Sequence, residues 1–156
     1  MRAAAALLLV VLLGGPAVAQ TSSALTPRIL NEVCLPFLRG GNILTAGRTA
    51  LSDRFRFRIV DNRAGDPVAP MLVLRGQGGS ALRLRMGNPR SCILTIPEAS
   101  VETVAGAAGA SLEQAGFVRV VSRAERVRWT AAQGDVIIDR NSRDTTTVTV
   151  RSPLRR

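Results

Sequence analysis

The sequence predicts an α+β fold, with one antiparallel sheet that carries its helices on a single face. Three observations predict it. Apolar residues recur at helical spacing in a few segments, many short segments alternate apolar and polar residues with a period of two, and the two halves of the chain resemble each other. A repeated unit of one helix and several strands favours a sheet whose helices all lie on one side.

Residues 1–19 have the features of a secretory signal peptide. Arg2 precedes an apolar run over residues 3–13, a Gly-Gly-Pro break follows, and small residues lead to an expected cleavage after Ala19. The apolar run is too short for a transmembrane helix, which needs about 20 apolar residues. We therefore expect one α+β domain over 20–156, periplasmic or secreted, with no transmembrane anchor after cleavage.

Two helices are expected at the start of the mature chain. The first begins at Thr26-Pro27, where a capping hydroxyl precedes a proline, and it ends at Gly40-Gly41. Pro36 is expected to bend or end this helix. Asn42 is a suitable cap for a second, shorter helix through about residue 51.

The clearest helical pattern follows Pro97-Glu98, which we expect to open a helix that stops at Gly116. Its apolar residues fall on one face. Gly106 and Gly109 each cost about 1 kcal/mol relative to alanine inside a helix. We therefore expect these glycines where the helix packs very close to the sheet.

Short segments with period-two alternation predict the strands. The two halves, 42–96 and 98–151, each read as a helix followed by about four such segments, so we predict a diverged tandem repeat. Residues 76–80 are rich in glycine and are expected to form a hairpin turn. The expected strands are 55–59, 71–75, 81–86, 91–96, 117–121, 127–131, 136–139 and 145–151.

The two cysteines, Cys34 and Cys92, are expected to form a disulfide, because cysteines of a small domain in an oxidising compartment are usually paired. The bond would join the first helix to the fourth strand. The alternative is a redox-active thiol, which usually needs a nearby second cysteine as in a Cys-x-x-Cys motif. These two cysteines lie far apart in the sequence.

Four short motifs stand out in the mature chain. They are Glu32-Val33-Cys34-Leu35-Pro36 after a signal peptide, Ser91-Cys92-Ile93-Leu94, Ala115-Gly116-Phe117 at a helix end, and Trp129 before Gly134-Asp135. With these motifs the chain resembles small exported proteins of alphaproteobacteria. The resemblance implies an exported domain with this fold, and because no activity is established for that family it carries no catalytic residue to this chain.

The composition excludes several chemistries. The chain has no histidine, so it has no Ser-His-Asp or Cys-His catalytic unit, and two cysteines cannot build a four-thiolate metal site. We expect no catalytic residue, metal or cofactor. A carboxylate-based enzyme remains an alternative. Glu98 and Glu102 are one helical turn apart, but acidic residues also stabilise a helix N-terminus.

Arginine is the distinctive residue of this chain. All 21 basic residues are arginines, against 11 acidic residues, for a net charge of +10. Guanidinium groups bind carboxylates and phosphates through paired hydrogen bonds. Some of the arginines alternate with apolar residues on three expected strands, and we expect them to share the open face of the sheet. They are Arg54, Arg56, Arg58, Arg83, Arg85, Arg126 and Arg128.

These observations favour a non-enzymatic periplasmic binding or interaction module whose partner is an anionic envelope component or an acidic protein. Nucleic acid is disfavoured as a partner, because the chain has few aromatic residues for base stacking and no binding motif. Two alternatives stay open. In the first, the arginines only keep the polar side of an amphipathic sheet solvated. In the second, the chain is a structural or assembly subunit. The sequence leaves the oligomeric state open.

Overall fold

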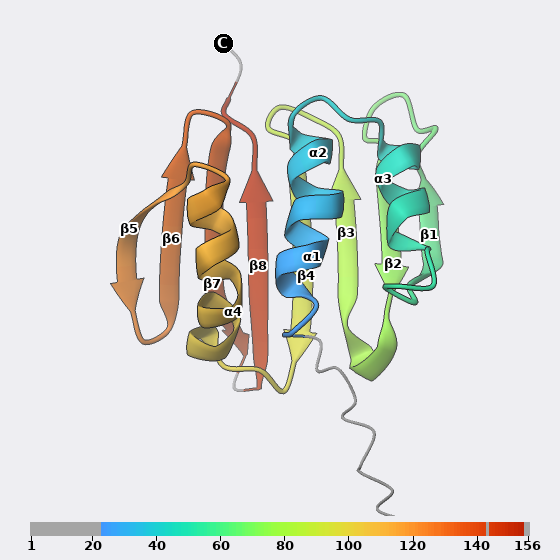
Figure 1. Ribbon diagram of the computed structural model, residues 1–156. Helices are drawn as coiled ribbons and strands as arrows, with labels where there is room; N and C mark the ends of the chain where they lie inside the picture. The colour runs from blue at the N-terminus through green and yellow to red at the C-terminus, as the bar shows by residue number, and fades with distance from the viewer. Residues whose placement is uncertain (1–22, 143, 155–156) are drawn as a thin grey trace, which may run out of the picture.

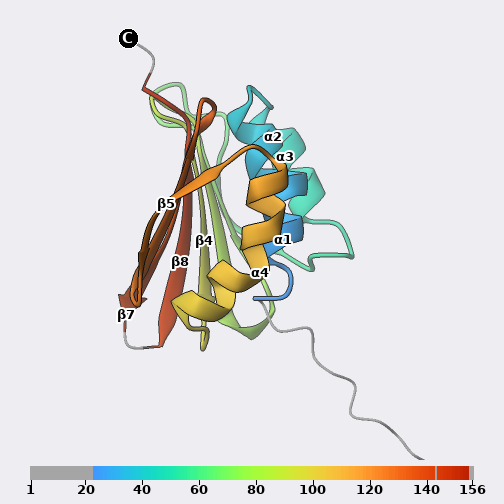
Figure 2. The same ribbon diagram turned by 60° about the vertical axis from the view of Figure 1, so that its left-hand side comes forward.

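The computed structural model describes residues 23–142 and 144–154, so the expected signal peptide lies outside the described residues. The chain forms two layers, an eight-stranded antiparallel sheet and helices that all lie on one of its faces (Figures 1 and 2). The predicted α+β fold class is confirmed. Within the described ranges, no helix has the length and apolar character needed to cross a membrane.

The first helical segment is continuous and contains a wider turn. It comprises α1 (Thr26–Ile29), a π-helical turn (Leu30–Cys34) and α2 (Leu35–Leu38). The Leu35 amide donates to the Leu30 carbonyl, one residue further back than in an α-helix. Pro36 follows directly and lacks an amide hydrogen, so it cannot make the usual helical bond. The wider turn accommodates Pro36 without ending the segment.

The second helix, α3 (Ile43–Ala50), starts where the sequence predicts it. The side-chain oxygen of Asn42 accepts a hydrogen bond from the Leu44 amide at 2.7 Å, which confirms Asn42 as the cap. Helix α3 lies against the sheet at Gly47, because a Cβ atom there would overlap the side chain of Leu72 on the strand beneath.

The third helix, α4 (Val101–Gln114), begins later than expected. Ser100 caps it by accepting from the Thr103 amide at 3.1 Å, whereas Pro97 ends a strand and Glu98 has a φ of 55°. The predicted start at Pro97-Glu98 is therefore wrong, and the predicted stop at Gly116 is confirmed. Close packing on the sheet is wrong for Gly106, which has nothing within 4 Å of a Cβ position.

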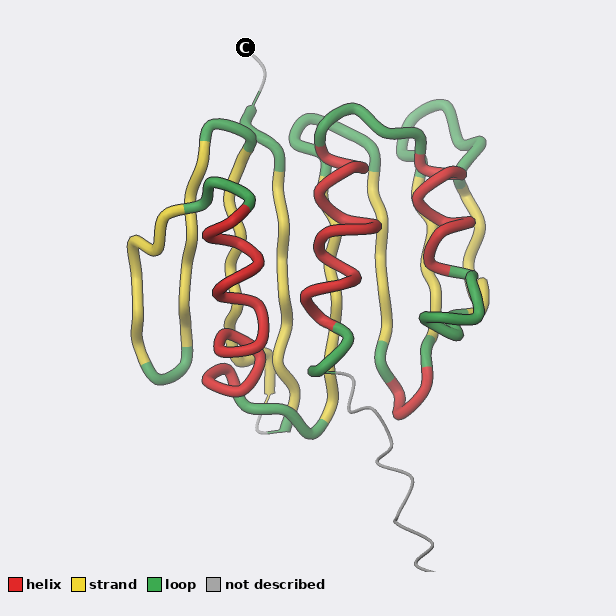
Figure 3. The backbone as a smooth tube through the Cα atoms, in the orientation of Figure 1, coloured by secondary structure: helices red, strands yellow, loops and turns green. Residues whose placement is uncertain are grey.

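The strands lie side by side in one sheet (Figure 3), and every neighbouring pair is antiparallel. Their order is β1-β2-β3-β4-β8-β7-β6-β5, so β4 and β8 are central and β1 and β5 are the edges. The strands are β1 (Arg58–Arg63), β2 (Met71–Arg75), β3 (Ala81–Arg85), β4 (Ser91–Pro97), β5 (Val118–Arg123), β6 (Arg126–Ala131), β7 (Gly134–Ser142) and β8 (Thr145–Arg151).

The strand predicted at 55–59 is wrong in its position. Phe55 and Phe57 are buried as expected, but Phe55 ends a turn in which the amides of Phe55 and Arg56 both donate to the Ser52 carbonyl, and Phe57 follows this turn. Arg56 has a φ of 53°, which an extended strand does not allow. Phe55 and Phe57 are thus both buried because the backbone between them is left-handed at Arg56, and not because it is extended. The first strand starts only at Arg58.

The two halves of the sheet are related by a local twofold axis at the paired residues Ile93 and Thr149. The register within β1–β4 recurs within β5–β8, and the first strand of each half has a bulge at the same place, at Val60 and Val120. Helices α3 and α4 precede the two halves. This arrangement agrees with the predicted repeat, and its origin by duplication stays a prediction.

The core lies between the sheet and the helices. If the arginines alternate with core residues, their apolar neighbours must be buried. The exposed fractions are 3% for Phe55, 0% for Leu82 and 5% for Val127. Trp129 on β6 is fully buried, as expected for a core residue. One face of the sheet is thus apolar and covered by the helices.

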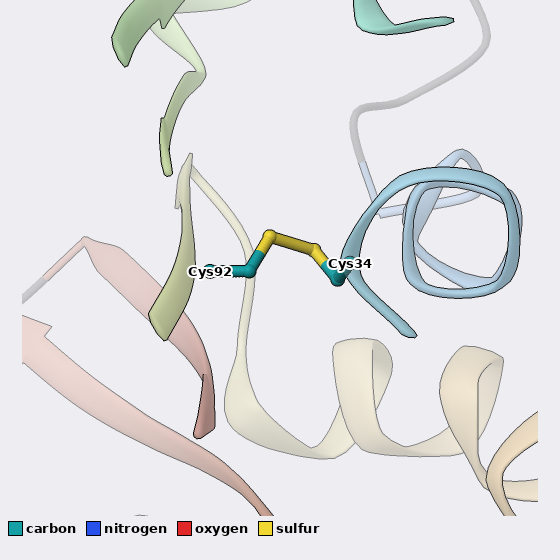
Figure 4. The surroundings of a disulfide bond; sticks show 2 residues. All are labelled: Cys34 and Cys92. Atoms are coloured by element: carbon teal, nitrogen blue, oxygen red, sulfur yellow. A yellow bond between two sulfur atoms is a disulfide. The ribbon is translucent and has the colours of Figure 1, made fainter. Parts of the chain in front are cut away.

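Cys34 and Cys92 form the expected disulfide, with their Cα atoms 5.5 Å apart (Figure 4). Both cysteines are fully buried. The bond joins the end of the π-helical turn to β4, and the predicted connection between the first helix and the fourth strand is confirmed.

Arg90 provides a second link between the same two parts of the fold. Its Nη1 atom donates to the carbonyl oxygens of Phe37 at 3.1 Å and Gly41 at 2.8 Å. The guanidinium also lies over the Phe37 ring, 5.7 Å from the ring centre. Arg90 therefore stabilises the contact between the first helical segment and the sheet.

Candidate anion-binding site

The uncovered side of the sheet, here called the open face, consists of the strand residues that alternate with the buried ones. Its charged residues follow from the register of the eight strands. They are nine arginines and three aspartates, so the arginines exceed the acids by six charges. They are Arg58, Arg63, Arg75, Arg83, Arg85, Arg123, Arg126, Arg128 and Arg151, with Asp61, Asp135 and Asp139.

Two of the arginines predicted for this face lie elsewhere. Arg54 precedes β1, and its Nη1 atom is 3.6 Å from Glu32 Oε2 on the first helical segment. Arg56 occupies the left-handed position in the same turn. Both predictions failed because the expected strand 55–59 does not form. The other five arginines are on the open face as predicted, namely Arg58, Arg83, Arg85, Arg126 and Arg128.

Four arginines of the open face were not predicted: Arg63, Arg75, Arg123 and Arg151. Each is the last residue of its strand. For Arg75 and Arg151, the alternation of the preceding residues already indicates the open face. Arg63 and Arg123 carry no such signal, because the bulge residues Val60 and Val120 reverse the alternation before them.

Four arginines surround a hollow of about 490 Å³ on the open face, here called the corner site. Ala69 of the loop between β1 and β2 and Pro89 of the turn between β3 and β4 form part of its wall. Its lining residues are Arg63, Arg83, Arg85 and Arg151, with Met71, Ser91, Ile93, Ala69 and Pro89.

The arginines of the corner site are largely without acidic partners. Arg63 Nε is 3.2 Å from Asp61 Oδ2, and both side chains are exposed. No carboxylate among the described residues lies within 4.0 Å of the guanidinium groups of Arg83, Arg85 or Arg151. Of the four arginines, three therefore carry positive charge that no acidic side chain of residues 23–142 and 144–154 pairs with.

Two aspartates, Asp135 and Asp139, partly offset the arginines of β5–β8 on the open face. Arg128 Nη2 forms a 2.8 Å ion pair with Asp135 Oδ2, and Arg126 is the register partner of Asp139. The local twofold axis makes Asp139 equivalent to Arg85, since these residues pair with Thr147 and Ser91 respectively. An acid thus stands in the second half where the corner site has an arginine.

The loop that borders the corner site is ordered by Asp66. Its Oδ1 atom accepts from the amides of Ala69 at 3.0 Å and Val68 at 2.8 Å. These two hydrogen bonds hold the pKa of Asp66 below its ordinary value. Asp66 is consequently ionised at neutral pH, and its bonds fix the segment that carries Ala69.

The carboxylates singled out in the sequence do not form a paired site on a helix. Glu98 lies before α4, in the left-handed conformation, and Glu102 lies in its first turn. Both side chains are exposed. The expected one-turn spacing of the two carboxylates on one helix is therefore wrong.

The fold and these contacts define a disulfide-linked α+β domain with an arginine-rich open sheet face. Comparisons with protein-family models, curated proteins and solved structures found no match to this chain.

Proposed function

We propose that this protein is a non-enzymatic binding module of the periplasm or the cell exterior, and that its open face binds an anionic component of the cell envelope. The observation that carries the proposal is the corner site, where three of four arginines have no acidic partner among the described residues. The disulfide is consistent with an oxidising compartment.

Binding on such a face occurs in two steps. The excess of arginines raises the local concentration of an anion through the long-range field. Guanidinium groups then form paired, charge-assisted hydrogen bonds with its oxygen atoms. Because exposed charges are screened over about 8 Å at physiological ionic strength, binding weakens as salt is added.

The test compares two double variants that remove the same charge from opposite sides of the molecule. Arg83→Gln/Arg85→Gln changes the corner site, and Arg39→Gln/Arg48→Gln changes exposed arginines of the helical side. Retention on immobilised heparin is measured in a salt gradient, with heparin as the polyanionic probe. We expect the corner variant to elute at clearly lower salt than the native protein, and the control to elute close to it.

Equal losses in the two double variants would mean that net charge alone governs retention, which would refute the proposed site. Retention of the native protein that does not change with salt would also refute it. The native fold of each variant is verified by circular dichroism before elution is compared.

A further inference from the structure

Three side chains of the corner site form a row across neighbouring strands. Arg85 on β3 is the register partner of Ser91 on β4, and Ser91 is the partner of Arg151 on β8. Adjacent strands are about 4.8 Å apart, so the two arginines start about 10 Å apart with the serine between them. Guanidinium groups that lean inward from this spacing can contact one tetrahedral anion above Ser91.

The serine has spare hydrogen-bonding capacity. Ser91 is partly buried in the hollow, and its hydroxyl has no hydrogen-bond partner in the part of the chain that the structure describes. Arg83 stands two residues from Arg85 on the same face, about 7 Å along the strand. The row and Arg83 thus supply three cations and one hydroxyl donor.

We propose that the corner site binds a phosphate monoester group, with the phosphate above Ser91 and between Arg85 and Arg151. This inference rests on the proposed function and names its ligand class. A phosphate monoester carries a charge of about −1.5 to −2 and three terminal oxygens, enough acceptors for several guanidinium groups. A carboxylate has two oxygens, which a single arginine engages in a paired contact.

The floor of the hollow suits the organic part of an ester. Met71 and Ile93 line it and are partly buried, so they offer apolar surface beside the arginines. Both residues lie on the open face next to the row that contains Ser91. An ester with some apolar character can therefore contact this floor while its phosphate contacts the row.

The described residues form one such site, although the sheet has twofold symmetry. The positions equivalent to Arg85 and Arg151 in the opposite corner hold Asp139 and Thr95. The acid there repels a phosphate. We therefore expect a stoichiometry of one phosphate group per chain.

The test is a nuclear magnetic resonance titration of the ¹⁵N-labelled protein at constant ionic strength. The probes are inorganic phosphate and glycerol 3-phosphate, with acetate as the carboxylate control. We expect saturable shifts of the backbone amides of Arg85, Ser91 and Arg151 with phosphate and with the ester. Acetate is expected to cause much smaller shifts.

Three variants locate the binding. Ser91→Ala keeps every charge and removes one donor, and Arg85→Gln removes one guanidinium; each is expected to weaken phosphate binding about tenfold. Arg126→Gln removes the same charge from the other half of the open face and is expected to leave the affinity unchanged. Equal effects of Arg85→Gln and Arg126→Gln would overturn the inference, as would an unchanged affinity of Ser91→Ala.

A second arm identifies the source of the phosphate. Cosedimentation is measured with phosphatidylcholine vesicles that contain phosphatidic acid, and with vesicles that contain oleate at equal surface charge. Preference for phosphatidic acid identifies a lipid headgroup, and binding of glycerol 3-phosphate alone identifies a soluble ester. Equal shifts with acetate and with phosphate, or cosedimentation with both kinds of vesicle to the same extent, overturn the phosphate inference. Heparin retention then still decides the proposed function separately.

Discussion

Removal of the disulfide by the double substitution Cys34→Ala/Cys92→Ala should strongly lower the free energy of unfolding. The bond closes a loop with a sequence separation of 58 residues. Loop-closure entropy for this length gives about 4 kcal/mol at 25 °C, because the cross-link restricts the unfolded chain. Domains of ordinary stability have unfolding free energies of about 5–15 kcal/mol, so the loss is a large share of the total.

Urea unfolding measures this loss directly. Trp129 is the single tryptophan of the chain and is fully buried on β6, so its fluorescence reports unfolding of the sheet. With a denaturant dependence of about 2 kcal/mol per molar urea, the midpoint should fall by about 2 M. Reducing agent should destabilise the native protein and leave the double variant unchanged. A loss below about 1 kcal/mol would refute the loop-closure argument.

Three further predictions concern single contacts. Arg90→Met removes two charge-assisted hydrogen bonds, to the carbonyl oxygens of Phe37 and Gly41, and should cost about 2–3 kcal/mol in urea unfolding; a loss below about 0.5 kcal/mol would contradict it. The pKa of Asp66 is lowered in the folded chain, so its stabilisation is present at neutral pH and is lost as pH falls below its ordinary value of 3.8. A carboxyl titration by nuclear magnetic resonance should therefore give a midpoint below 3.8, and a midpoint at or above it would exclude the two amide contacts. Gly47→Val should destabilise the fold by about 2 kcal/mol, because the new side chain meets Leu72. Gly106→Ala should stabilise it by about 1 kcal/mol, because open space surrounds this position. Thermal unfolding should therefore show a lower melting temperature for the first variant and a higher one for the second.

The alternation of residue types predicted burial better than it predicted backbone conformation. Phe55 and Phe57 are buried as the pattern requires, but a turn with Arg56 at positive φ places them there. An alternation with a period of two indicates which side chains face the core. More than one backbone conformation can place those side chains there. The strands that follow extended backbone throughout, such as β2 and β8, were predicted with the correct bounds.

The corner site could be predicted only in part. Arg83 and Arg85 follow from alternation along one strand. Arg151 joins them because β8 lies next to β4, a pairing between distant parts of the chain that no local pattern indicates. The bulge at Val60 also changes which side of β1 Arg63 occupies. Strand order and bulges are set by packing of the whole sheet, and they determine which arginines meet.

The symmetry of the central strand pair bears on how such a chain can arise. The two halves meet along β4 and β8, which are equivalent strands of the repeat. The twofold axis between them exchanges the pair Cys92 and Val150 with the pair Leu94 and Val148. Two copies of a half-length ancestor could therefore assemble into an eight-stranded sheet by joining their final strands. Fusion of the two copies into one gene would then free each to diverge, so that one half could carry cysteine and arginine where the other carries valine and aspartate.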